Sequence, residues 1–232
     1  MATPSLLGLT LTLSPTALTA LRLAPLISST ASLTHAYMEY LTNSAFLGPA
    51  PVDSSLSRFL IGSDASASSQ TASSQPLSSE SPTQAAQAAQ AARVSEAKQI
   101  VLPHWFTTFF NTAIRSVIGL NSLTLLGASF NLRLADGLGD SKILYRIGLV
   151  SALAHYAFVP LVGRSVRALI GMAAGRKEEE REEEKGEEKE KEAKNAEDWV
   201  KEWIGWHKVR MGTVDVLAWG SFACGAVGAL TV

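Results

Sequence analysis

Four long apolar stretches constrain this chain of 232 residues more than any other feature. They are residues 16–38, 105–130, 143–162 and 209–232. A helix needs roughly 20 mainly apolar residues to cross the hydrocarbon layer of a membrane. The first stretch meets this requirement least well, because serine, threonine, Arg22 and Pro25 dilute it. The pattern predicts an all-α, multi-pass membrane protein, built as an antiparallel bundle of four transmembrane helices.

Two polar segments interrupt the apolar stretches. The first begins as serine-rich, low-complexity sequence that is too poor in apolar residues to fold alone, and it ends in alanine-rich sequence that favours a helix. The second is dense in Glu and Lys at spacings that favour an exposed helix. The predicted order is the N-terminus and first span (1–51), a partly disordered polar insert (52–100), the second and third spans (101–175), a charged insert (176–205) and the fourth span (206–232).

The composition and charge of the chain argue against several classes of partner and site. Hydrophobic residues make up 47% of the chain and the net charge is −1, so no basic excess indicates nucleic acid as a partner. The single cysteine, Cys224, excludes a disulfide framework and a thiolate metal site. Basic residues near the ends of the spans are more numerous on the side of the two inserts. The positive-inside rule therefore predicts that both inserts are cytoplasmic, and the sequence does not define the organelle.

Each apolar stretch carries one of the four histidines, at its end or within it. They are His35, His104, His155 and His207. If the helices cross the membrane in strict alternation, all four imidazoles lie in the same half of the bilayer. Histidine titrates near neutral pH and binds metals, so this layer is a candidate site.

Polar residues also form a stripe along the second span. His104, Thr108, Asn111, Arg115 and Ser122 share one face of a helix at 3.6 residues per turn. Because lipid cannot solvate such groups, we expect the stripe to face the bundle interior, with Arg115 paired to Glu39 or Asp215. His35 and Glu39, one turn apart, are either a base with its orienting carboxylate or a simple polar pair. For each of the other polar residues, a purely structural role is also an alternative.

The available ligand types argue against a di-iron centre. A di-iron bundle requires two Glu-x-x-His pairs on facing helices, and the spans contain none. A three-histidine site stays open, although we predict no metal. The lipid bilayer is the one partner that the sequence predicts directly.

Four short motifs give the chain a resemblance. They are Leu33-Thr34-His35-Ala36-Tyr37, Pro103-His104-Trp105-Phe106, Val159-Pro160 and Trp206-His207-Lys208-Val209-Arg210. In this order the chain resembles the anthrone oxygenase-like family of small four-span membrane proteins. The likeness covers the spans, about half of the chain, and the two long inserts depart from the family pattern.

The resemblance implies a monooxygenase that oxidises a flat, apolar anthrone to an anthraquinone with O₂ and no organic cofactor. Removing the acidic methylene proton requires a base, for which His207 or His35 is the candidate. Arg115 and Arg210 would stabilise the resulting anion. His104, Asn111, His155 and Trp206 are then the residues expected to contact the substrate.

A non-enzymatic role is the alternative. The charged segment 176–202 suits a membrane scaffold that docks a basic protein partner through it. A carrier is less well supported, because broken helices and inverted repeats are not evident.

Overall fold

The computed structural model describes residues 5–6, 9–10, 13–48, 82–134, 138–175 and 194–231. Its helices are α1 (Pro15–Ala45), α3 (Pro82–Arg133), α4 (Ser141–Ala154), α5 (Val159–Ala173), α6 (Ala196–Arg210) and α7 (Val216–Leu230), with a 3₁₀ turn η3 (His155–Phe158) and a π-helical turn η5 (Met211–Asp215). Two strands of two residues each, β1 (Ser5–Leu6) and β2 (Leu9–Thr10), pair antiparallel near the N-terminus. The predicted all-α class is confirmed.

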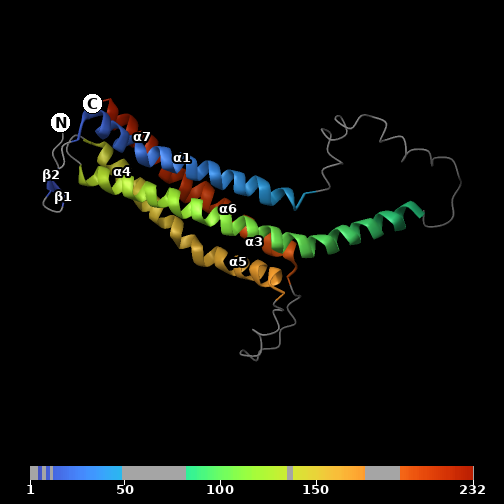
Figure 1. The fold of residues 1–232 in the computed structure, drawn as a ribbon. Coiled ribbons are helices and arrows are strands. Elements are labelled where there is room, and N and C mark those ends of the chain that lie inside the picture. Colours follow the sequence, from blue (N-terminus) through green and yellow to red (C-terminus); the bar gives the residue numbers. More distant parts are fainter. Residues whose placement is uncertain are drawn as a thin grey trace, which may run out of the picture.

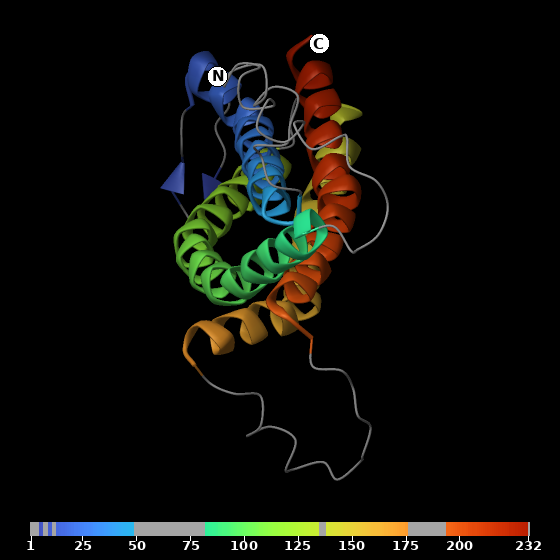
Figure 2. The same cartoon turned by 90° about the vertical axis from the view of Figure 1, so that its right-hand side faces the viewer.

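The helices form four rods in an elongated bundle (Figure 1). The first two rods are α1 and α3, the third is α4–η3–α5, and the fourth is α6–η5–α7. Both chain ends lie at the same end of the bundle. Figure 2 shows α5 at the edge of the group, below the other rods. The rods alternate in direction, as the sequence predicted.

Three rods are long and apolar enough to cross a membrane: Ala91–Arg133, Ser141–Ala173 and Ala196–Leu230. Helix α1, for which a crossing was also predicted, is long enough at 31 residues but not apolar enough to meet the same standard, and it packs along α3 and α7. The reason is the polar content noted above, which lowers its mean hydropathy. The membrane bundle therefore has three clear spans and a more polar fourth helix beside them.

Two helices extend from the spans into the inserts, where the sequence favours helix. The alanine-rich end of the first insert is helical and continuous with the second span, so α3 starts at Pro82. The fourth rod starts at Ala196, where Asn195 caps it by accepting a hydrogen bond from the backbone N–H of Asp198 at 3.0 Å. Residues 52–81 and 176–193, the rest of both inserts, lie outside the described part of the chain.

A proline inside α1 creates one of the links between helices. Pro25 has no N–H, so the carbonyl of Leu21 loses its usual helical partner. The side chain of Asn131 on α3 donates to this carbonyl at 2.7 Å and is itself fully buried. Next to it, a Cβ on Gly127 would meet the Pro25 ring at 3.2 Å. The hydrogen bond from Asn131 replaces the helical bond that the carbonyl of Leu21 lacks, and it holds α1 and α3 in close contact.

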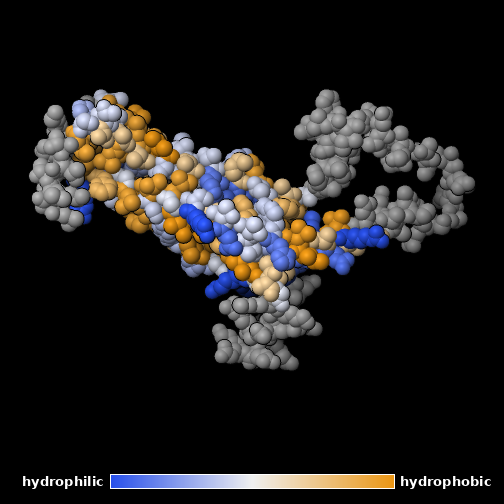
Figure 3. Space-filling view, in the orientation of Figure 1, coloured by the Kyte–Doolittle hydropathy of each residue, from blue (hydrophilic) through white to orange (hydrophobic). Residues whose placement is uncertain are grey.

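The interior contains two apolar clusters. One lies toward the inserts and includes Leu102, Phe106, Leu169, Trp199, Val200 and Trp203. The other lies toward the chain ends and includes Ala128, Leu138, Tyr145, Ala152, Ala218 and Phe222. On the face shown in Figure 3, orange residues dominate the end that holds the termini, and blue and white residues mix with them farther along. Between the two clusters, each rod carries polar residues.

Candidate functional site

A layer of six titratable residues separates the two apolar clusters. It consists of His35 and Glu39 on α1, His155 in η3, His207 and Arg210 on α6, and Asp215 in η5. The contacts among them form two groups, each organised around one carboxylate.

Glu39 lies between two histidines. Its Oε1 is 3.5 Å from Nδ1 of His35, one turn away on α1, and its Oε2 is 3.8 Å from Nε2 of His207. Both Glu39 and His207 are buried, with 6% and 1% of their surface exposed. Nε2 of His207 also lies 2.8 Å from the carbonyl oxygen of Ala36, and its ring stacks on Trp203 with centroids 4.7 Å apart. These contacts fix the ring of His207 from several directions.

Asp215 is the centre of the second group. Its Oδ1 contacts Nδ1 of His155 at 2.9 Å, and its Oδ2 accepts a hydrogen bond from Nε of Arg210 at 3.2 Å. The three side chains are almost fully buried. The carboxylate therefore neutralises the guanidinium and orients an imidazole from a different rod.

Local departures from α-helical geometry make the second group possible. In an α-helix, residues five apart point roughly 140° from each other around the axis. The π-helical turn Met211–Asp215 widens the helix, so Arg210 and Asp215 come onto one side. On the facing rod, Pro160 cannot donate to the carbonyl of Tyr156. Val159 donates to that carbonyl instead, and His155 begins a 3₁₀ turn. π-Helical turns occur often at functional sites.

A groove between α1 and α3 leads to this layer from outside the bundle. It is open and about 380 Å³ in volume, and it is lined by His35, Trp105, Thr108, Phe109, Thr112, Ala113 and Ser116. Trp105 and Phe109 stack with their centroids 5.1 Å apart. Nε2 of His35 is 3.1 Å from Oγ of Ser116, whereas its Nδ1 is buried toward Glu39. His35 therefore connects the groove with the buried layer.

The structure brings together four of the residues that the sequence singled out: His35, His155, His207 and Arg210. The contact predicted between His35 and Glu39 is confirmed. The pairing predicted for Asp215 is wrong in its partner, because Arg210 takes the place foreseen for Arg115.

The polar stripe on α3 is the main correction. His104, Asn111 and Arg115 are exposed on the outer surface of the bundle instead of facing inward. His104 is therefore separate from the other three histidines. The stripe lies on the outside because α3 packs on its neighbours through other faces: Thr124 donates to Ser28 on α1, and Asn121 donates to the carbonyl of Ala152 on α4. At the centre of a span, a charged side chain costs about 2.5–3.5 kcal/mol on insertion scales, so the exposure of Arg115 requires an explanation.

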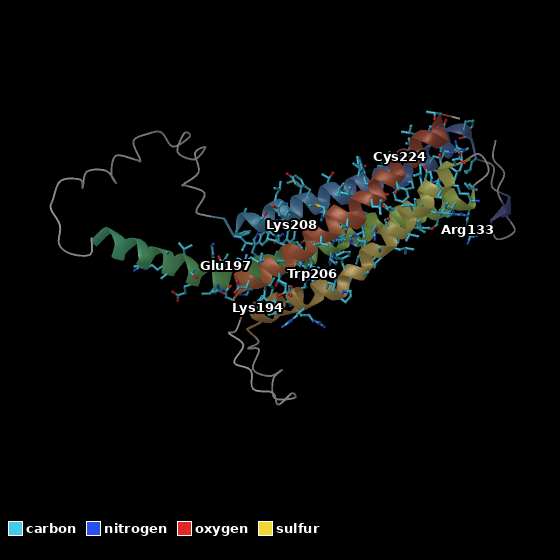
Figure 4. The ribbon with its side chains drawn as sticks, turned by 180° about the vertical axis from the view of Figure 1, so that it is seen from behind. Arg133, Lys194, Glu197, Trp206, Lys208 and Cys224 are labelled. Atoms are coloured by element: carbon cyan, nitrogen blue, oxygen red, sulfur yellow. The ribbon has the colours of Figure 1, made fainter. Side chains whose placement is uncertain are left out.

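Trp206 also lies outside the polar layer. It is 37% exposed, and Figure 4 places it with Lys208 on α6, between the end that carries Arg133 and the end that carries Glu197. Its neighbour His207 is buried because successive residues of a helix point in different directions. Trp206 therefore faces the surroundings of the bundle.

The sequence does not reveal the groove as a site. Among its lining residues, sequence patterns single out His35, Thr108 and Trp105, but they do not connect Phe109, Thr112 or Ser116 with a site. One signal was available, because Thr108, Thr112 and Ser116 follow each other at steps of four and form a line of hydroxyl groups on one helix face. That line contacts α1 at His35, a pairing across helices that sequence periodicity does not reveal.

The part of the chain that the structure describes contains no group of three or more His, Cys, Asp or Glu side chains arranged to hold a metal ion. The polar layer instead alternates acids with bases, which suits hydrogen bonding and proton transfer. The chain matches no known family model, no curated protein and no solved structure.

Proposed function

We propose that this protein is a membrane enzyme that removes a proton from a flat, weakly acidic aromatic compound such as an anthrone and lets the resulting anion react with O₂. The observation that carries the proposal is the position of His35. Its ring lines an open groove between two helices, and the buried carboxylate of Glu39 lies 3.5 Å from its Nδ1.

The groove suits such a substrate in shape and chemistry. The stacked rings of Trp105 and Phe109 offer flat apolar surface, and aromatic pairs favour offset-stacked or edge-on packing. The groove is open to the outside of the bundle, so an apolar compound dissolved in the membrane reaches it without passing through water. The hydroxyl groups of Thr108 and Thr112 supply polar contacts along one wall.

His35 is favoured over His207 as the base. His207 is 1% exposed and its Nε2 is occupied by the carbonyl of Ala36, so a substrate has no path to it. Nε2 of His35 instead lies beside Ser116, a groove residue. If the neutral ring carries its proton on Nδ1, which is 3.5 Å from Oε1 of Glu39, then Nε2 is the basic nitrogen toward the groove, and the carboxylate stabilises the imidazolium that forms.

The reaction balances without an organic cofactor. His35 takes a proton from the methylene carbon of the anthrone, which leaves an enolate. The enolate transfers electron density to O₂ and a carbon–oxygen bond forms, which gives a hydroperoxide after protonation. Loss of the remaining hydrogen on that carbon, together with cleavage of the O–O bond, releases water and leaves a carbonyl group. One oxygen atom enters the quinone and the other leaves as water.

The test is O₂ consumption by the protein in proteoliposomes supplied with a series of anthrones, corrected for spontaneous oxidation in protein-free vesicles. Because general-base catalysis contributes about 10²–10⁴-fold, His35→Gln should lower the protein-dependent rate at least about 100-fold. Thr34→Ala, an exposed neighbour outside the groove, is the control and should leave the rate unchanged. Unchanged uptake in His35→Gln would exclude this mechanism, and no uptake with any anthrone would favour the scaffold role.

A further inference from the structure

Arg115 is the exposed cation closest to the groove on α3. It directly precedes Ser116 and follows Thr112 by three residues, and both of these line the groove. Residues three or four apart are neighbours on a helix surface, so Arg115 borders the groove residues Thr112 and Ser116 on α3. Asn111, one turn before Arg115, is exposed on the same side.

The level of Arg115 within the bundle makes its exposure costly. Ser116 contacts His35, so Arg115 lies at the level of the polar layer, between the two apolar clusters. It is ten residues, or roughly 15 Å, along α3 from Trp105, where the apolar part of the span begins. A cation at this level within a membrane requires a counter-charge.

The described part of the chain does not supply that counter-charge. Arg115 forms no ion pair or hydrogen bond with any residue in the described ranges. The two carboxylates at this level, Glu39 and Asp215, are buried and already engaged with histidines and with Arg210. In the described ranges, a second copy of the chain docked on this face would present the same two buried acids at this level. A ligand of the groove would supply the anion directly.

We infer that the groove binds aromatic compounds carrying an ionised carboxylate, with the ring system between Trp105 and His35 and the carboxylate on Arg115. A bidentate contact between guanidinium and carboxylate is a strong, directional hydrogen-bonded pair. The amide of Asn111 adds a donor next to it. The groove favours such a compound over a partner helix, because it extends along α3 from the stacked rings to Thr112 and Ser116, the groove residues next to Arg115.

This inference deepens the proposed function, since it uses the same groove and adds an acidic group to the substrate. Arg115 then sets the position of the ring relative to His35. It acts as a specificity residue, which is a different role from the anion stabilisation expected from the family resemblance.

Binding measured without turnover tests the inference. Anthracene 1-, 2- and 9-carboxylates have no reactive methylene group, and their methyl esters are uncharged controls of the same shape. The compounds are titrated into nanodiscs that contain the protein, where a bound anthracene accepts excitation energy from tryptophan. Titration into empty nanodiscs corrects for partition into lipid. At least one carboxylate should bind about 10-fold more tightly than its ester. Energy transfer should fall in Trp105→Phe, which would place the compound in the groove.

Variants at the rim decide the role of Arg115. Arg115→Gln should remove the preference for the carboxylate and leave the affinity for the ester unchanged, whereas Arg115→Lys should keep part of it. Arg133→Gln, an exposed arginine at the end of the same helix, is the matched control. Equal binding of acid and ester by the unaltered protein, or a preference that persists in Arg115→Gln, would overturn the inference.

The two proposals fail separately. A carboxylate preference without O₂ uptake would leave the binding site standing and remove the oxygenase. Uptake with neutral anthrones and no carboxylate preference would support the oxygenase and remove the carboxylate site. The counter-charge of Arg115 would then be assigned to an acidic residue on a membrane helix of another protein.

Discussion

Asp215 contacts two cationic or titratable side chains at once, Arg210 and His155, and no other carboxylate in the described ranges lies within 4.0 Å of either. Removing one partner of a buried ion pair leaves an uncompensated charge, which typically costs about 3–5 kcal/mol. Asp215→Asn should therefore lower the free energy of unfolding by about 3 kcal/mol, measured by loss of helicity during titration with a denaturing detergent.

The matched control is Asp198→Asn. Asp198 pairs with Lys201 at 3.3 Å on the surface, and such pairs are worth about 0–1 kcal/mol. The double variant Arg210→Met with Asp215→Leu should recover most of the lost stability, since it removes both charges together. If Asp215→Asn is as stable as the unaltered protein, the ion pair between Asp215 and Arg210 does not contribute to the free energy of unfolding.

Glu39 offers a second prediction at the scale of a single residue. Its carboxylate contacts His35 and is not itself in the groove, so it positions the base without touching the substrate. Glu39→Gln should lower the O₂ uptake rate about 10-fold, because a neutral amide no longer stabilises the imidazolium. An uptake rate equal to that of the unaltered protein would assign Glu39 a structural role only.

The sequence identified these polar residues but not all of their partners. The pair His35 and Glu39 was predictable, since four residues along a helix is one turn. The pair Arg210 and Asp215 was not, because five residues apart places them on one side only in a π-helical turn. Such a turn depends on contacts between rods, here with His155, and local sequence preference does not encode it.

At the scale of elements, glycines allow the close contact between α4 and α7, and Gly148 is one of them. A Cβ on Gly148 would lie 2.5 Å from the ring of Phe222, which is fully buried. Because overpacking in a dense core costs about 1–3 kcal/mol, Gly148→Ala should lower the free energy of unfolding by that amount.

Gly163→Ala is the control for this substitution. Gly163 lies on the same rod, in α5, and a Cβ there would meet nothing within 4 Å. Because alanine is the better helix former, this variant should be neutral or more stable by up to about 1 kcal/mol. Phe222→Leu should restore part of the stability lost in Gly148→Ala, and equal effects of the two glycine variants would contradict the packing seen here.

The helices themselves were largely predictable from sequence, and their faces were not. Runs of apolar residues located the three clear spans. Helical periodicity also grouped the polar residues of α3 correctly, but it did not indicate whether that face points inward. Arg115 shows the reason: a polar face is inward only if another helix covers it, and α1 instead covers the face with Ala113 and Thr124.

At the scale of the molecule, the alternation of the rods predicts opposite locations for two surface positions. Arg133 ends α3 near the chain termini, and Lys194 precedes α6 at the far end (Figure 4). In a Cys224→Ala background, which removes the only cysteine, single cysteines at these two positions should react with a membrane-impermeant maleimide from opposite sides of sealed vesicles.

The same assay examines α1, the helix with the weakest apolar character. Cysteines at Ser14 and Gly48, just beyond its two ends, should also be labelled from opposite sides if α1 crosses. Labelling of both from one side would place α1 along the membrane surface. That result would be incompatible with the contact of His207 with Ala36 inside the bundle.

The polar layer has a consequence for biogenesis. His35 and Glu39 are synthesised early, whereas the residues that shield them, such as His207, leave the ribosome about 170 residues later. As α1 emerges alone, it exposes an acid and an imidazole that lipid does not solvate, and its apolar content is too low to offset them. We therefore expect α1 to be retained at the translocon, or to enter the bilayer only reversibly, until α6 and α7 arrive. Insertion of the first helix would then depend on synthesis of the last.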